Sequence, residues 1–123
     1  MSRAAAERPD PGTRAVLVGA PGKVNLGLRV AARRGDGYHE LDTLFATVDL
    51  ADELRLERTA AGVTGEVEVD PAAGEAGDVP PIGPGNLAAR AAAAWLRAAD
   101  AEGGVRIVLR KALPTAAGLG GGS

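Results

Sequence analysis

The chain has 123 residues, of which 46% are apolar and 24% charged, an ordinary composition for one globular domain. The formal net charge of -2 gives no general electrostatic reason to bind nucleic acid or an anionic membrane, so any phosphate recognition must be local. The absence of cysteine excludes disulfides, thiolate metal ligands and a cysteine nucleophile.

The first fourteen residues are rich in Ala, Arg and Pro, and they contain no apolar run of the kind that a signal peptide needs. We expect residues 1–14 to be a disordered lead-in of a cytoplasmic protein. Elsewhere the chain has no run of about eighteen apolar residues, so we expect no transmembrane helix.

Two apolar, β-forming runs open the ordered part of the chain. Residues 15–20 and 24–30 are predicted to be two strands that meet at a bend at Pro21-Gly22. A polar, glycine-bearing loop is predicted at residues 33–37, and residues 41–50 are predicted to form the next strand.

Two further stretches alternate charged with apolar residues, which is the period of a half-buried strand. They are residues 53–58 and 66–69, and we expect them to form a hairpin or meander that turns at residues 60–62. Residues 71–85 lack any periodicity and are rich in Pro, Gly and acidic residues, which predicts a surface loop.

A helix is predicted after this loop, with Asn86 as its N-cap. Apolar residues recur at helical spacing at Leu87, Ala91, Ala94, Trp95 and Ala98. Gly103-Gly104 is the predicted stop signal, and residues 105–109 alternate as a strand. Trp95, like Phe45, is predicted to belong to the core. Several strands, one helix and a further strand favour an α+β fold over a regular βαβ winding.

The chain ends in a glycine-rich segment, residues 114–123, in which backbone N–H groups can converge on a phosphate. It lacks the lysine of a Walker A loop, so that motif is excluded. Six residues separate Lys111 from Gly118, which disfavours a dinucleotide-binding turn directly after a strand. By composition alone Gly-Gly-Gly-Ser would also suit a flexible linker, but the strand and Pro114 before it favour a phosphate-binding loop.

Three motifs together resemble the GHMP kinase superfamily. They are Ala20-Pro21-Gly22-Lys23-Val24-Asn25-Leu26, then Arg34-Gly35-Asp36-Gly37-Tyr38-His39-Glu40-Leu41, then Lys111-Ala112-Leu113-Pro114 leading into Gly118-Leu119-Gly120-Gly121-Gly122-Ser123. The glycine loop identifies only the superfamily. The Asp-Gly-Tyr-His element points to the branch of the family whose substrate carries cytidine.

The resemblance implies an α+β fold like the second domain of ribosomal protein S5. Residues 15–123 would be the N-terminal domain of such a kinase, truncated in its phosphate-binding loop. The family's catalytic aspartate would then lie beyond Ser123, so we expect a 123-residue fragment to have negligible activity.

The resemblance also implies the reaction. The γ-phosphate of ATP, with Mg²⁺, would pass to the 2-hydroxyl of 4-diphosphocytidyl-2-C-methyl-D-erythritol, a step of non-mevalonate isoprenoid biosynthesis. Lys23 matches the active-site lysine, and Asn25, which alternation places on the same strand face, would contact substrate with Tyr38 and His39. The residues implied in ATP binding are Asn86, Leu87, Lys111, Pro114, Ala117, Gly118, Leu119, Gly120, Gly121, Gly122 and Ser123.

Simpler interpretations remain beside these roles. Lys23 and Lys111 could each be a solvated surface lysine. Asn86 could be a helix cap and nothing more, and Tyr38 and His39 could belong to an exposed loop without a role. No carboxylate cluster indicates metal ligands. The alternative functions are a GHMP kinase for a non-nucleotide alcohol and a non-catalytic S5-like binding module. Neither nucleic acid nor a membrane is expected as a partner, and the oligomeric state is not predicted.

Overall fold

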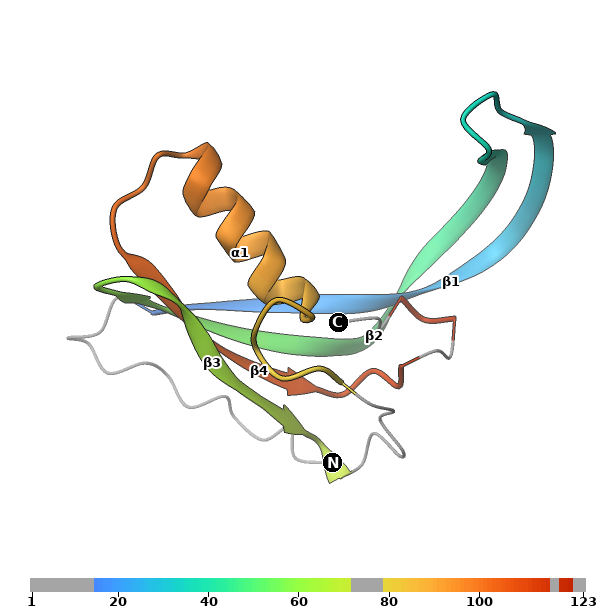
Figure 1. Ribbon diagram of the computed structural model, residues 1–123. Helices are drawn as coiled ribbons and strands as arrows, with labels where there is room; N and C mark the ends of the chain where they lie inside the picture. Colours follow the sequence, from blue (N-terminus) through green and yellow to red (C-terminus); the bar gives the residue numbers. More distant parts are fainter. Residues whose placement is uncertain (1–14, 72–78, 116–117, 121–123) are drawn as a thin grey trace.

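The computed structural model describes residues 15–71, 79–115 and 118–120. In chain order this part of the protein forms β1 (Ala15–Arg33), β2 (His39–Thr59), β3 (Gly62–Val69), α1 (Leu87–Ala98) and β4 (Gly104–Lys111). The strands make one sheet in the order β1-β2-β4-β3, and α1 lies over one face of it (Figure 1). The predicted α+β class is therefore confirmed. Residues 1–14, expected to be a disordered lead-in, lie outside the described residues.

The first two strands are much longer than predicted. β1 continues through Pro21-Gly22, where its register against β2 shifts between Pro21 and Lys23, so the predicted division into two strands is wrong. Proline is tolerated here because, within the part of the chain that the structure describes, β1 is an edge strand with β2 as its one neighbour. β2 likewise joins the two strands predicted at residues 41–50 and 53–58, since Ala51 and Asp52 keep their pairing with Pro21 and Ala20.

Beyond Lys23 the two long strands leave the sheet as an arm, which consists of residues 23–33 and 39–47 and the loop between them. β4 pairs only with residues 53–59 of β2, so no third strand among the described residues supports this arm. Figure 1 shows the arm curving toward the face of the sheet that carries α1. Phe45 lies on the arm with 59% of its surface exposed, so the prediction that it belongs to the core is wrong.

The predicted hairpin between the second and third strands is also wrong. β4 lies between them, antiparallel to β2 and parallel to β3, with Gly104 opposite both Thr59 and Gly62. A Cβ at Gly104 would lie 2.1 Å from the carbonyl oxygen of Gly62. Glycine at this position therefore allows β4 to start between two backbones that approach it closely.

The prediction that Gly103-Gly104 ends the helix is wrong, because the helix ends several residues earlier and Gly104 already belongs to β4. α1 ends at Ala98 with Ala99 as its C-cap, and Asp100 follows at φ 46°. Asp100 N–H donates to Arg97 C=O at 3.3 Å and Ala101 N–H donates to Leu96 C=O at 3.0 Å. This is the hydrogen-bond pattern of a Schellman motif, with aspartate in the left-handed position that glycine usually takes.

The start of α1 agrees with the sequence, because Asn86 is its N-cap. Its Oδ1 accepts from Ala88 N–H at 3.0 Å and Ala89 N–H at 3.2 Å, while its Nδ2 donates to Pro80 C=O at 2.9 Å. Residues 79–85, the described end of the predicted surface loop, contain no helix or strand, as expected. Asn86 thus fixes both the helix and the loop that leads to it.

The helix covers the sheet incompletely. The buried apolar residues are Ala89 of α1, Ile107 and Leu109 of β4, and Leu113 after it. Between α1 and the sheet remains a cavity of about 730 Å³, lined by Leu54, Leu56 and Trp95 among others. Trp95 is 65% exposed, so its predicted core position is wrong: it faces this open space rather than a packed layer.

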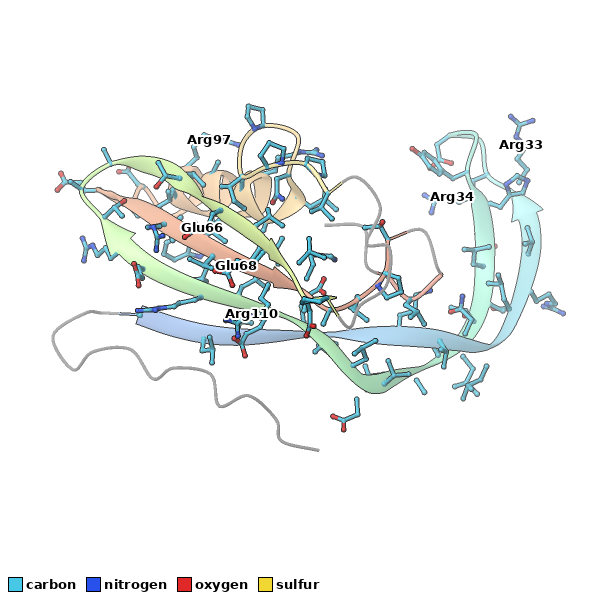
Figure 2. The ribbon with its side chains drawn as sticks, turned by 90° about the horizontal axis from the view of Figure 1, so that it is seen from below. Arg33, Arg34, Glu66, Glu68, Arg97 and Arg110 are labelled. Atoms are coloured by element: carbon cyan, nitrogen blue, oxygen red, sulfur yellow. The ribbon has the colours of Figure 1, made fainter. Side chains whose placement is uncertain are left out.

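The opposite face of the sheet carries a ladder of charges, as the alternating pattern predicted. Arg106 pairs with Glu57 and Glu66, and Arg110 pairs with Glu53 and Glu68. Figure 2 shows Glu66, Glu68 and Arg110 on this face. Because these pairs are partly exposed, they contribute little to stability, but they leave the α1 face as the apolar side of the sheet.

Candidate active site

Lys23 and the glycine-rich loop lie together in the structure. Lys23 N–H donates to Leu119 C=O at 2.9 Å, and Lys23 Nζ donates to Gly118 C=O at 3.2 Å. An ammonium group has three donors, so one bond to a carbonyl leaves capacity to bind a phosphate oxygen. The structure thus brings together the predicted active-site lysine and three predicted phosphate-binding residues, Gly118, Leu119 and Gly120.

Glycines allow this close approach. Gly118 and Gly120 have φ of 74° and 80°, a region that favours glycine. A Cβ at Gly22 would lie 2.7 Å from Leu113 Cδ2 and 3.3 Å from the carbonyl oxygen of Leu119. Gly22 therefore serves as the packing surface under the loop, and not as the turn residue that the Pro-Gly pair suggested.

Asp52 anchors the chain just before the loop, and it is 2% exposed. Its Oδ1 accepts from Ala112 N–H and Leu113 N–H, both at 2.8 Å, and its Oδ2 accepts from Lys111 Nζ. Sequence reasoning missed Asp52. The available signal was an acidic residue inside a strand-forming stretch and a lysine at the end of another strand.

Lys111 is not a surface charge, because it is 0% exposed and paired with Asp52. That simpler interpretation is therefore wrong. Pro114 follows Leu113 at the exit from this buried cluster and is half-buried. Ala117, Gly121, Gly122 and Ser123, which the sequence also assigned to ATP binding, lie outside the described residues.

Asn25 lies on the same face of β1 as Lys23, as alternation predicted, because the register is unbroken from Lys23 to Asn25. Its Oδ1 accepts from Thr43 Oγ1 at 3.3 Å. Asn25 pairs with Phe45, so this exposed aromatic ring shares the face of Lys23. Alternation along β2 places His39 on that face too. Sequence reasoning missed Phe45 because an isolated aromatic residue in a strand usually belongs to the core.

Tyr38 and His39 lie at the far end of the arm. Tyr38 is 75% exposed, and its N–H donates to Asp36 Oδ1 at 3.1 Å, while Arg34 pairs with Asp36 at 3.0 Å. His39 is opposite Arg33, and the ten residue-to-residue steps of strand from Lys23 to Arg33 correspond to about 30 Å of path. Along the strand these two rings are distant from Lys23, although the arm curves toward the α1 face (Figure 1).

Asn86 and Leu87 mark the N-terminus of α1. In Figure 1 this end of the helix is directed toward the side of the fold where the glycine loop lies. The Asn86 side chain is buried in its capping bonds, whereas Leu87 is exposed. Of the two, Leu87 is the side chain that offers surface to a ligand.

The described residues contain neither a cluster of metal ligands nor a helix able to cross a membrane. Within residues 15–71, 79–115 and 118–120, no group of three or more His, Cys, Asp or Glu side chains is arranged to hold a metal ion. In the same part of the chain, no helix has the length and apolar character needed to span a membrane.

Comparison with known proteins identifies the class of protein that this fold and site resemble: small-molecule kinases. No model of a known protein family matches the chain. Curated relatives share one name, 4-diphosphocytidyl-2-C-methyl-D-erythritol kinase. Those from Thermus thermophilus, Moorella thermoacetica and Deinococcus radiodurans are 51%, 47% and 46% identical to this chain over 104 residues each, or 85% of its length. The resemblance inferred from the motifs is confirmed.

A solved structure agrees. The crystal structure of a 4-(cytidine 5'-diphospho)-2C-methyl-D-erythritol kinase superposes with a TM-score of 0.63 at 47% identity, over 86% of this chain. The alignment covers 35% of that structure, and the chain spans about a third of the length of the curated relatives it matches.

Proposed function

We propose that this chain provides the phosphate-binding loop and the active-site lysine of a kinase that phosphorylates the 2-hydroxyl of 4-diphosphocytidyl-2-C-methyl-D-erythritol, in the cytoplasm, with ATP as donor. The observation that carries the proposal is the contact of Lys23 with Gly118 and Leu119. The shared name of the relatives supports the cytidine-carrying substrate over another alcohol. In this proposal residues 15–123 belong to one kinase domain.

The chemistry requires positioning and charge stabilisation. In the transfer, the bond between the γ-phosphorus and the bridging oxygen of ADP breaks, and a bond to the 2-hydroxyl oxygen forms. Backbone N–H groups of the loop, at Gly118–Gly120 with Ala117, Gly121, Gly122 and Ser123, would hold the triphosphate, and Pro114, which has no N–H, would set the direction of the chain that leads into the loop. Lys23 would neutralise charge that develops on the transferred group. The hydroxyl proton must pass to a base, and we assign none among the described residues.

Substrate recognition would follow the arm. Asn25 lies two residues from Lys23 on the same face and would hydrogen-bond the methylerythritol end of the substrate. The rings of Tyr38 and His39 would contact cytosine, since stacking contributes on the order of 1–3 kcal/mol per base. Phe45, which is opposite Asn25, would contact the substrate nearer its methylerythritol end. Along the arm, Lys23 comes first, Asn25 and Phe45 follow, and His39 lies at the far end. This order suits an extended substrate in which a diphosphate separates methylerythritol from cytosine.

The remaining assignments concern the adenine end of ATP and the metal. Leu87 would contact the nucleotide directly, whereas Asn86 and Lys111 are buried in bonds to the protein and would shape the site. Mg²⁺ would enter on the phosphates of ATP and neutralise part of their charge. The carboxylates of the described residues do not form a ready-made site for it.

The test is a steady-state assay of the purified full-length protein with ATP and either the cytidine substrate or methylerythritol 4-phosphate, which lacks the cytidine. We expect ADP release and a 2-phosphate product with the first acceptor only. Equal rates with both acceptors would favour a kinase for a non-nucleotide alcohol. No transfer to either would contradict the proposed function.

A further inference from the structure

The strongest unassigned feature is the buried cluster around Asp52. This carboxylate joins β2 to the segment that leads from β4 into the glycine loop, 60 residues later in the chain. One oxygen, Oδ1, accepts two successive backbone N–H groups, those of Ala112 and Leu113, both at 2.8 Å. The other, Oδ2, accepts from the buried ammonium of Lys111. All three donors come from consecutive residues, so one side chain fixes the whole turn out of β4.

The contacts continue from this turn to the site. Leu113, held through its N–H, places its side chain on Gly22, where a Cβ would lie 2.7 Å from Leu113 Cδ2. Gly22 is followed by Lys23, whose N–H and Nζ bind the carbonyls of Leu119 and Gly118. The position of the loop relative to Lys23 thus depends on where Leu113 sits.

We propose that Asp52 is a positioning residue for the phosphate loop: its Oδ1 holds Ala112 and Leu113 so that the loop and Lys23 meet in the geometry that binds ATP. Lys111 acts through Asp52, by balancing the buried carboxylate, and does not touch the nucleotide. The inference rests on the proposed function for its kinetic readout, but the ordering of the loop is measurable without any reaction.

Removing either charge alone would leave the other charge buried without this counter-charge, which destabilises a fold whatever the role of the pair. The informative variants are therefore two neutral doubles of matched shape. Asp52→Asn with Lys111→Met keeps a side-chain oxygen for the N–H groups of Ala112 and Leu113. Asp52→Leu with Lys111→Met has nearly the same shape and no acceptor. Glu53→Gln, which alters an exposed pair with Arg110 on the other face, is the control.

Two readouts on the full-length protein separate positioning from general stability. In hydrogen-deuterium exchange, we expect the amides of Ala112 and Leu113 and those of residues 118–120 to exchange at least about tenfold faster in the Leu double than in the Asn double. Ala112 and Leu113 N–H both lose their acceptor in the Leu double, and one lost hydrogen bond corresponds to about tenfold. In kinetics, we expect the KM for ATP to rise about tenfold in the Leu double alone, with the KM of the alcohol acceptor equal in both doubles.

Equal loop exchange and equal KM for ATP in the two doubles would overturn the positioning role. Faster exchange throughout the protein in the Leu double, with no excess at residues 112–120, would also overturn it, because it would show a merely structural residue. If the wild-type protein phosphorylated neither acceptor, the proposed function would fail, and loop exchange would still decide the role of Asp52.

Discussion

Lys23 Nζ lies 3.2 Å from the carbonyl oxygen of Gly118, a residue 95 positions later in the chain. The contact joins an edge strand to a glycine loop whose backbone adopts positive φ at Gly118 and Gly120. A flexible cation is thereby held beside a segment suited to bind phosphate.

Replacing the lysine should impair chemistry far more than folding. For Lys23→Ala we expect kcat to fall about 100-fold or more, the usual effect of removing one group that stabilises charge in the transition state. Lys23 is only half-buried, so the far-UV circular dichroism spectrum should not change. Arg29→Ala is the control, since Arg29 is an exposed cation of the same strand paired with Asp42. Similar losses in both variants would contradict a specific role for Lys23.

Adding one methyl group at Gly22 should disturb the packing under the loop. Its Cβ would lie 2.7 Å from Leu113 Cδ2 and 3.1 Å from Val48 Cγ2. We expect Gly22→Ala to lower the free energy of unfolding by about 1–3 kcal/mol, as overpacking usually does. Urea denaturation measures this, with Gly19→Ala as the control because nothing lies within 4 Å of its Cβ position. Equal urea midpoints for the two variants would show that Leu113 and Val48 move aside without cost, and would contradict tight packing at Gly22.

The arm should affect the alcohol acceptor and not ATP. Phe45 shares the face of Lys23, whereas Leu44 points to the opposite face, and both are exposed. For His39→Ala we expect the KM of the cytidine substrate to rise about tenfold, within the range for a lost base contact, with the KM for ATP little changed. For Phe45→Ala, which removes a ring opposite Asn25, we expect a smaller rise in the same KM and again little change in the KM for ATP. Leu44→Ala should change neither. A parallel rise in both Michaelis constants would contradict base recognition by the arm.

The Asn86 cap should contribute more to the free energy of unfolding than an ordinary surface hydrogen bond does. Asn86 Oδ1 binds two N–H groups of the first turn, and Nδ2 binds Pro80 C=O. We expect Asn86→Ala to cost about 1–2 kcal/mol of unfolding free energy. Asn86→Asp, which keeps the acceptor and loses the donor, should recover part of this cost. If thermal unfolding showed no difference between these variants, the capping bonds would not be the source of the stability.

The local parts of the fold were predictable from sequence. The alternation at residues 53–58 and 105–109 predicted strands, and Asn86 before an apolar stripe predicted the helix start, because both signals depend on neighbours within one or two turns. The insertion of β4 between β2 and β3 was not predictable in this way. It depends on pairing between segments 45 residues apart, such as Thr59 and Gly104, which no local pattern encodes.

The residues of the site that lie in sequence motifs were predictable, whereas those whose role depends on burial were not. Lys23 and the glycine loop were found through their motifs and lie together in the structure. The charges of Asp52 and Lys111 beside strand-forming stretches were the available signal, but their pairing was not predictable, because a buried ion pair between distant strands leaves no period in the sequence. Phe45 and Trp95 were assigned to the core because each lies on an apolar face of its predicted element, and the arm and the open cavity leave them exposed.

The most direct test of the central claim is to map where ATP binds. Backbone amide shifts of the ¹⁵N-labelled full-length protein would be followed during titration with a non-hydrolysable ATP analogue and Mg²⁺. We predict that the largest shifts occur at Lys23, Gly118, Leu119 and Gly120, and that the Lys23→Ala variant shows them only at higher nucleotide concentration. Saturable shifts confined to other parts of the fold, or none at all, would contradict the assignment of this loop and lysine as the ATP phosphate site.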